Sequence, residues 1–193
     1  MATSSPEITN RLKKLYADYR NTADIDARGR FFAADCRQIC RPKPTYAAQN
    51  RATIVRYLHE SSGLSINGAS VTEEEASKKK KSFATIRPLR PEEFDFGNDE
   101  LVQHAGFATV DDLKRHAEQR GWVGMHVDLW EEEEDGEKTA DGLSQGTLIK
   151  VQYWWARDQS KDAADGDWIQ VFHDIMYIGP LDGTQGLDSE LIK

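Results

Sequence analysis

The chain has 193 residues and a formal net charge of −8, and its length suits one domain with a substantial core. The acidic balance argues against a general nucleic-acid or anionic-lipid surface, and no apolar run approaches the roughly 20 residues of a membrane span. The N-terminal stretch MATSSPEITNRLKK lacks the apolar segment of a signal peptide, so we expect a cytoplasmic protein that binds neither nucleic acid nor membrane.

Helical patterns dominate the first third of the chain. Pro6 follows two serines and opens a stripe of apolar residues at helical spacing that continues to Tyr19. A shorter helix is predicted over Ile25–Phe32, the segment CRQICR reads as a short strand, and a third helix is predicted over Asn50–Glu60. Cys36 and Cys40 would lie about 13 Å apart on one strand, too far for a disulfide, so we expect buried free thiols.

The middle of the chain changes character. Residues 61–82 are polar, rich in Gly and Ser, and carry three Glu followed by four Lys, which predicts a mobile surface loop. A strand is predicted over Phe83–Leu89. A helix follows, with Thr109 as N-cap and Gly121 as C-cap.

Three strands are predicted at the end of the chain, over Trp122–Glu132, Thr147–Ala156 and Trp168–Ile178, separated by loops rich in Gly, Asp and Ser. Helices come mostly first and strands mostly last, which indicates a single α+β domain with helices packed on one face of a curved antiparallel sheet. The acidic run of residues 131–135 reads as a solvated turn rather than a calcium site, and we predict no metal site.

Alternation along the last three strands defines two faces of the sheet. One face is mostly apolar and includes Tyr153, Trp155, His173 and Tyr177, and we expect it to lie against the helices. The other face combines aromatic and polar side chains, and this mixture predicts a contact between two subunits. The mixed face contains Trp122, Gly124, His126, Asp128, Trp130, Leu148, Lys150, Gln152, Trp154, Trp168, Gln170, Phe172, Asp174, Met176 and Ile178.

His173 and Asp174 are adjacent, so they point to opposite faces and do not form a dyad. His173 is the first candidate for a general acid or base, and the alternative is a core histidine satisfied by its neighbours. Tyr153 is a second catalytic candidate, and the alternative is a core aromatic residue with a satisfied hydroxyl. Asp174 is a catalytic candidate or part of a polar network across a dimer. If the pocket lies on the mixed face instead, Asp128 with His126 would perform the chemistry.

The order of elements, together with the segments GWVGMHVDLW, VQYWW and WIQVFHDIMYIGPLDGT, resembles the SnoaL-like branch of the nuclear-transport-factor-two-like superfamily, in particular its fungal members. The resemblance implies a conical α+β fold, a homodimer formed through the sheet, and a pocket between the concave sheet and the helices. Members that are enzymes use Asp, His, Tyr or Arg in this pocket, usually without metal or cofactor.

The resemblance also suggests which residues would contact a substrate. Tyr16 and Tyr19 on the first helix would lie at the pocket mouth, with core packing as the alternative. Gln38 would lie where relatives often place a pocket residue, and the alternative there is a helix cap with a surface ion pair. Trp155 and Tyr177 would contribute from the helix-facing side of the sheet.

Two functions of different classes follow. The first is a cofactor-independent enzyme that isomerises, dehydrates, cyclises or opens an epoxide in a small apolar oxygenated metabolite, such as a polyketide or terpenoid intermediate. The alternative is a non-catalytic module of the same fold for small-molecule binding or dimerisation.

Overall fold

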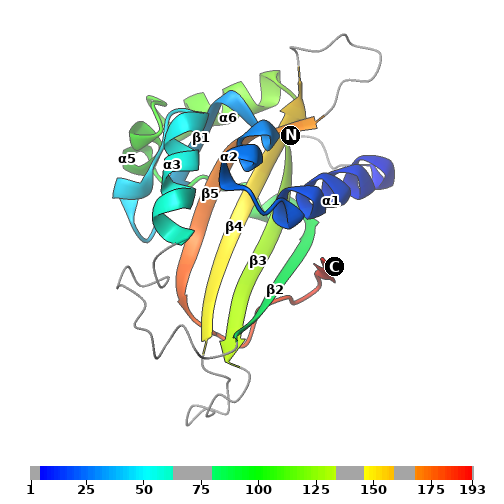
Figure 1. Ribbon diagram of the computed structural model, residues 1–193. Coiled ribbons are helices and arrows are strands. Elements are labelled where there is room, and N and C mark those ends of the chain that lie inside the picture. Colours follow the sequence, from blue (N-terminus) through cyan, green and yellow to red (C-terminus); the bar gives the residue numbers. More distant parts are fainter. Residues whose placement is uncertain (1–4, 63–79, 134–145, 159–167, 193) are drawn as a thin grey trace.

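A computed structural model describes residues 5–62, 80–133, 146–158 and 168–192 of the chain (Figure 1). These residues form one curved, unclosed sheet of six strands in the order β1-β5-β4-β3-β2-β6. The strands are β1 (Phe32–Cys40), β2 (Lys80–Pro88), β3 (Val123–Glu133), β4 (Gly146–Arg157), β5 (Trp168–Pro180) and β6 (Glu190–Leu191). The predicted α+β class is confirmed, with one correction: β1 runs parallel to β5, so the sheet is not wholly antiparallel.

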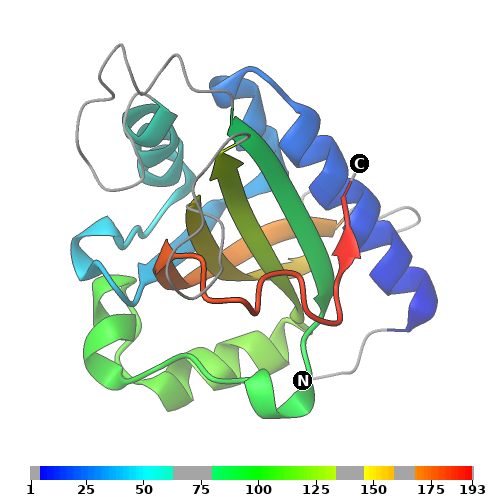
Figure 2. The ribbon, with the colours of Figure 1, turned by 90° about the horizontal axis from the view of Figure 1, so that it is seen from below.

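The N-terminal helices pack on one face of this sheet. They are α1 (Pro6–Asn21), α2 (Ile25–Arg28) and α3 (Arg51–Ser62), with the short 3-10 helices η1 (Gly29–Phe31) and η2 (Pro44–Tyr46) beside them. Figure 2 shows how the sheet curves around this side. The Ser5 hydroxyl caps α1 by accepting a hydrogen bond from the backbone N–H of Ile8 at 3.3 Å. Apolar residues spaced along α1, with Leu12 fully buried among them, then face the sheet.

A second group of helices covers the opposite face. It consists of η3 (Pro91–Glu93), α5 (Asp99–His104) and α6 (Val110–Gln119). Thr109 caps α6 as predicted, and Gly121 follows its end in the left-handed conformation, with φ of 59°. The sequence reading missed α5, which has only six residues. Its signal is local: the Asn98 side chain caps it, and two acidic residues follow in the first turn.

Two irregularities in β5 change which side chains share a face. Pairing with β4 shifts once between Ile175 and Tyr177 and again between Gln170 and Phe172. Each shift is a bulge, with one extra residue on β5, so the alternation of side chains reverses on passing it. Ile178 and Gln170 therefore join the face that carries His173. Tyr177 moves to the opposite face.

The mixed face is covered by the chain itself. Trp154 and Phe172 are both 0% exposed, and Phe96, in the segment between η3 and α5, packs against both, with ring centroids 4.9 and 5.6 Å away. The C-terminal segment also crosses this face, where the Gly186 N–H donates to Asp128 at 2.8 Å. Trp154 and Phe172, two of the residues on which the expected homodimer through this face rested, are therefore core residues of one chain, and the homodimer stays a prediction.

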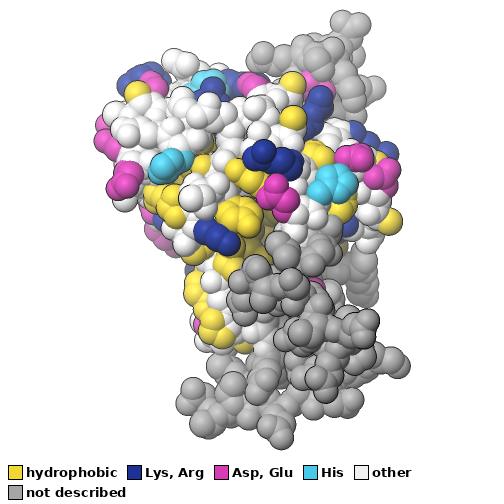
Figure 3. Space-filling model, turned by 60° about the vertical axis from the view of Figure 1, so that its left-hand side comes forward, with side chains coloured by type: hydrophobic (Ala, Val, Ile, Leu, Met, Phe, Trp, Pro, Cys, Tyr) yellow, Lys and Arg dark blue, Asp and Glu magenta, His cyan; other side chains and the backbone are white. Residues whose placement is uncertain are grey.

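Charged side chains are interspersed over the surface that Figure 3 shows, and hydrophobic side chains gather in its middle and lower part. Most of the predicted loop at 61–82 lies outside the described residues, although residues 80–82 already belong to β2. Residues 131–133 of the acidic run continue β3, and the remaining two lie outside the described residues. Within the described part of the chain, no helix is long and apolar enough to span a membrane.

Candidate functional site

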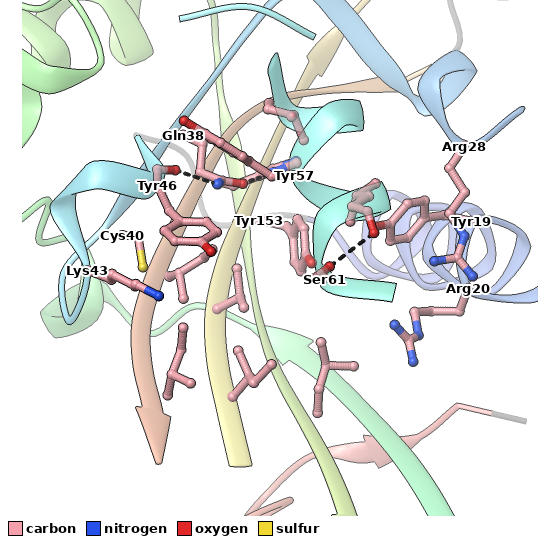
Figure 4. A pocket seen from close by; sticks show the side chains of 18 of the residues that line it. Tyr19, Arg20, Arg28, Gln38, Cys40, Lys43, Tyr46, Tyr57, Ser61 and Tyr153 are labelled. Atoms are coloured by element: carbon pink, nitrogen blue, oxygen red, sulfur yellow. Dashed lines mark hydrogen bonds between the residues drawn. The ribbon is translucent and has the colours of Figure 1, made fainter. Parts of the chain in front are cut away.

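A cavity of about 430 Å³ lies between the sheet and the N-terminal helices (Figure 4). Its lining comes from α1, α2 and α3, from η2 and its preceding loop, and from strands β1, β3, β4 and β5. This volume falls within the range of roughly 300–1,000 Å³ that is typical of small-molecule sites. The cavity opens on the face that carries His173, as the alternation of the strands predicted.

The sheet supplies an aliphatic floor to this cavity. Ile149 and Val151 on β4 are flanked by Leu129 on β3 and by Ile175 and Ile178 on β5. Ile149 pairs directly with Ile178 only because of the bulge near Tyr177. A floor built from branched aliphatic side chains favours an apolar ligand body over a strongly hydrated one.

His173 lies in the wall of the cavity with three partners around its ring. The ring Nε2 is 2.9 Å from Oε1 of Gln170 and 3.9 Å from the Cys36 thiol. The ring Nδ1 is 3.4 Å from Oε1 of Gln38. Gln38 is held in this orientation because its own amide donates to the Tyr46 carbonyl at 2.8 Å.

We assign the neutral tautomer of His173 from the lengths of these two contacts. A neutral imidazole carries one N–H, and the shorter contact places it on Nε2, donating to Gln170. The Nδ1 lone pair then faces Gln38 Oε1, which is also an acceptor, so the two atoms cannot form a hydrogen bond. In this tautomer Nδ1 keeps a free lone pair, and the His173 side chain lines the cavity.

Burial keeps His173 neutral. The side chain is 3% exposed, and desolvation lowers the pKa of the imidazole from 6.5 to about 3. The neighbouring thiol of Cys36 is also uncharged, because burial raises its pKa well above the usual value. Cys36 and Cys40 are both free and buried, as predicted.

This low pKa makes a prediction for stability. The unfolded chain binds a proton at His173 near pH 6.5 and the folded chain only near pH 3, so the stabilisation present above pH 6.5 is lost as pH falls through this window. We expect a loss of about 2 to 3 kcal/mol between pH 7.5 and 4.5, from roughly 1.4 kcal/mol per pKa unit. Urea unfolding at several pH values measures it.

The comparison that isolates His173 is His173→Leu, which should remove most of this pH slope whatever its effect on absolute stability. His116 supplies a smaller residual slope, because burial and nearby arginines lower its pKa as well. Equal slopes in the two proteins would show that His173 is not buried in its neutral form.

Tyr153 is the cross-strand neighbour of His173. The two residues are paired between β4 and β5, and their ring centroids are 4.8 Å apart in an edge-to-face arrangement. Tyr153 is 7% exposed and lines the cavity. Burial raises its pKa well above the usual value of 10.0, so its hydroxyl is a neutral hydrogen-bond donor at any working pH.

Of the residues predicted to contact a substrate, Tyr19 and Gln38 line the cavity and three others do not. Tyr16 is 0% exposed and packs against Tyr153 from behind, at 5.3 Å between ring centroids. Trp155 is 1% exposed. Tyr16 and Trp155 therefore belong to the core and do not line the cavity. Tyr177 lies on the opposite face, because the bulge in β5 reverses the alternation.

The mixed face holds the other catalytic candidates, outside the cavity lining. Asp174 is 0% exposed and accepts hydrogen bonds from Nε and Nη2 of Arg41, the latter at 2.6 Å. Nε2 of His126 lies 2.8 Å from Asp128, which also accepts from the C-terminal segment. Both arrangements join the sheet to the segments that cover it, and this favours a structural role.

Three residues of the site were missed from the sequence: Gln170, which contacts His173, and the lining residues Lys43 and Tyr46. Gln170 was assigned to the wrong face because a bulge leaves no mark in the alternation pattern. Lys43 and Tyr46 lie in an irregular segment around two prolines, where no periodicity exists to place them. Among the described residues, no group of three or more His, Cys, Asp or Glu side chains is arranged to hold a metal ion.

Comparison with known proteins identifies the family. The model of the SnoaL-like domain matches residues 1–193, so the chain belongs to the SnoaL-like domain family, and the resemblance seen in the sequence is confirmed. No curated protein matches the chain.

Two solved structures are similar to this chain. Aln2 from a Streptomyces species is 11% identical, with 90% of this chain and 93% of that chain aligned and a TM-score of 0.49. A protein from Novosphingobium aromaticivorans, described as a candidate aromatic ring hydroxylase, is 12% identical, with coverage of 92% and 96% and a TM-score of 0.45.

Proposed function

We propose that this protein is a cofactor-independent enzyme that moves a proton on a small, largely apolar, oxygenated molecule, such as a polyketide or terpenoid intermediate. The reaction would be an isomerisation, dehydration, cyclisation or epoxide opening. The observation that carries the proposal is that His173 and Tyr153, cross-strand neighbours with ring centroids 4.8 Å apart, both line a cavity with an aliphatic floor. A base and a neutral donor on adjacent strands can act on two atoms of one ligand.

The chemistry follows from the hydrogen-bond roles of the two residues. Nδ1 of His173 takes a proton from a carbon next to a carbonyl, and the electrons of the C–H bond form an enolate. The phenol of Tyr153 donates a hydrogen bond to the enolate oxygen. The imidazolium donates to the amide oxygens of Gln38 and Gln170, which stabilise its charge until the proton returns to the product.

A direct test uses 2-tetralone, a bicyclic ketone small enough for the cavity. We expect the protein to accelerate exchange of its α-protons for deuterium, measured by NMR in D₂O. Tyr153→Phe should lower this rate by about 10²-fold, because it removes one donor to the enolate oxygen. Exchange no faster than in buffer alone, for 2-tetralone and for related β-diketones, would contradict the proposed reaction.

The alternative is a non-catalytic binding module. One observation favours it: the Nε2–H of His173 is already satisfied by Gln170, as in a structural core histidine. The two functions differ in the same experiment. A binding module would be stabilised thermally by 2-tetralone without exchanging its protons.

A further inference from the structure

We propose that the molecule bound in this cavity carries a negative charge, a carboxylate or an ionised phenol, which Arg20 and Arg28 recognise. The inference rests on the proposed function in that it concerns the same site, but it is a statement about binding. It narrows the substrate class from an apolar oxygenated molecule to an amphipathic anion with an apolar body.

The two arginines border one end of the cavity. Arg20 is in the last turn of α1 and Arg28 is the last residue of α2, and both line the cavity. Figure 4 shows both guanidinium groups beside Tyr19, with Lys43 on the opposite side. Their charges act on the same groups, because each opposes the rise in pKa that burial imposes on Tyr16 and Tyr19.

Neither arginine is neutralised within the described part of the chain. Nε of Arg28 donates to the Thr22 carbonyl at 2.7 Å, and its guanidinium carbon lies 5.7 Å from the centre of the Tyr19 ring. No ion pair joins Arg20 or Arg28 to a described carboxylate. Five other arginines, by contrast, form ion pairs with Asp or Glu within 3.2 Å: Arg41, Arg87, Arg90, Arg115 and Arg120.

The charge of the cavity wall is opposite to that of the protein. Among the described lining residues, Arg20, Arg28 and Lys43 are cationic and Glu131 is the one carboxylate. The cavity lining therefore carries more cations than anions in a chain whose net charge is −8. Guanidinium groups form charge-assisted hydrogen bonds with carboxylates and phenolates, and a partly desolvated site strengthens these bonds.

The arrangement also orients the ligand. An anionic group beside Arg20 and Arg28 lies close to Tyr19, and Tyr19 lies 6.5 Å from Tyr153 between ring centroids. An apolar body that extends from this anchor over the aliphatic floor would therefore pass Tyr153 and His173. The proposed anion is the fixed end of the substrate, and the reacting carbonyl lies farther along it.

Binding of 2-naphthoate and of its neutral counterpart 2-naphthamide, compared by titration calorimetry, tests the inference. We expect the wild type to bind the carboxylate at least about tenfold more tightly at low salt. Arg20→Gln and Arg28→Gln should each reduce this preference, and the double variant should abolish it. Affinity for 2-naphthamide should stay unchanged, which shows that the cavity remains intact.

Arg30→Gln is the matched control, because Arg30 is exposed, is two residues from Arg28 and does not line the cavity. It should keep the full preference. Equal affinity of the wild type for both ligands, absence of binding by both, or a preference that persists in the double variant would overturn the inference. Proton exchange of the neutral ketone 2-tetralone is a separate measurement. It tests the proposed function, and its outcome does not depend on whether the cavity prefers an anion.

Discussion

His173→Asn is expected to lower the rate of α-proton exchange by about 10²- to 10⁴-fold, the usual contribution of a positioned general base. Asparagine is polar and smaller than histidine, so it can still contact Gln38 or Gln170 while offering no basic nitrogen. The loss should fall on turnover rather than on binding. Affinity for 2-naphthamide, together with thermal unfolding, establishes whether the cavity and the fold are retained.

A matched control is available at His104, which is exposed at the end of α5 and does not line the cavity. His104→Asn should leave exchange unchanged. An active His173→Asn protein would remove His173 as the base. Loss of activity together with loss of the fold would instead be resolved with His173→Gln, which is larger and fills more of the site.

Arg41→Met is expected to destabilise the protein by about 3 to 5 kcal/mol at pH 7, because it leaves the buried Asp174 carboxylate without its partner. Asp174 is 0% exposed, and Arg41 also bonds to the carboxylate and carbonyl of Asp95. This pair therefore connects β5 to the segment that covers the mixed face. Urea unfolding of the two proteins measures the difference.

The loss of stability caused by Arg41→Met should become smaller at acidic pH. Burial already raises the pKa of Asp174, and Arg41 is the group that opposes this rise. Without Arg41 the pKa rises further, so the destabilisation present at pH 7 is relieved as pH falls and Asp174 becomes protonated. Arg90→Met is the control, since Arg90 pairs with an exposed Asp188 and should cost less than about 1 kcal/mol. Equal losses for both variants would contradict a buried role for Arg41.

Much of the fold was predictable because the relevant patterns are local. Apolar spacing and caps located α1 and α6, and alternation along β3 and β4 placed Tyr153 on the face of the helices. The same alternation separated His173 from Asp174, and the structure places them on opposite faces of the sheet.

The remaining features depend on contacts that are distant in sequence. The two bulges in β5 place Ile178 instead of Tyr177 on the cavity face and bring Gln170 next to His173. They arise from the pairing of β5 with β4, which cannot be predicted from the alternation of residues along one strand. The mixture of aromatic and polar residues on the mixed face was predicted correctly, but the chain's own segment around Phe96 covers its Trp154 and Phe172, and the homodimer stays a prediction. A sheet face that is buried by another segment of the same chain carries the same kinds of residues as a face that is buried by a second subunit.

The central claim is that His173 presents an unprotonated Nδ1 to the cavity, and ¹⁵N NMR of histidine-labelled protein tests it most directly. At pH 7 we expect a neutral ring with its proton on Nε2, and an Nδ1 signal that moves when 2-naphthamide is added while His173→Asn lacks that signal. A ring that is protonated on Nδ1, or an Nδ1 signal that the ligand leaves unchanged, would contradict the account.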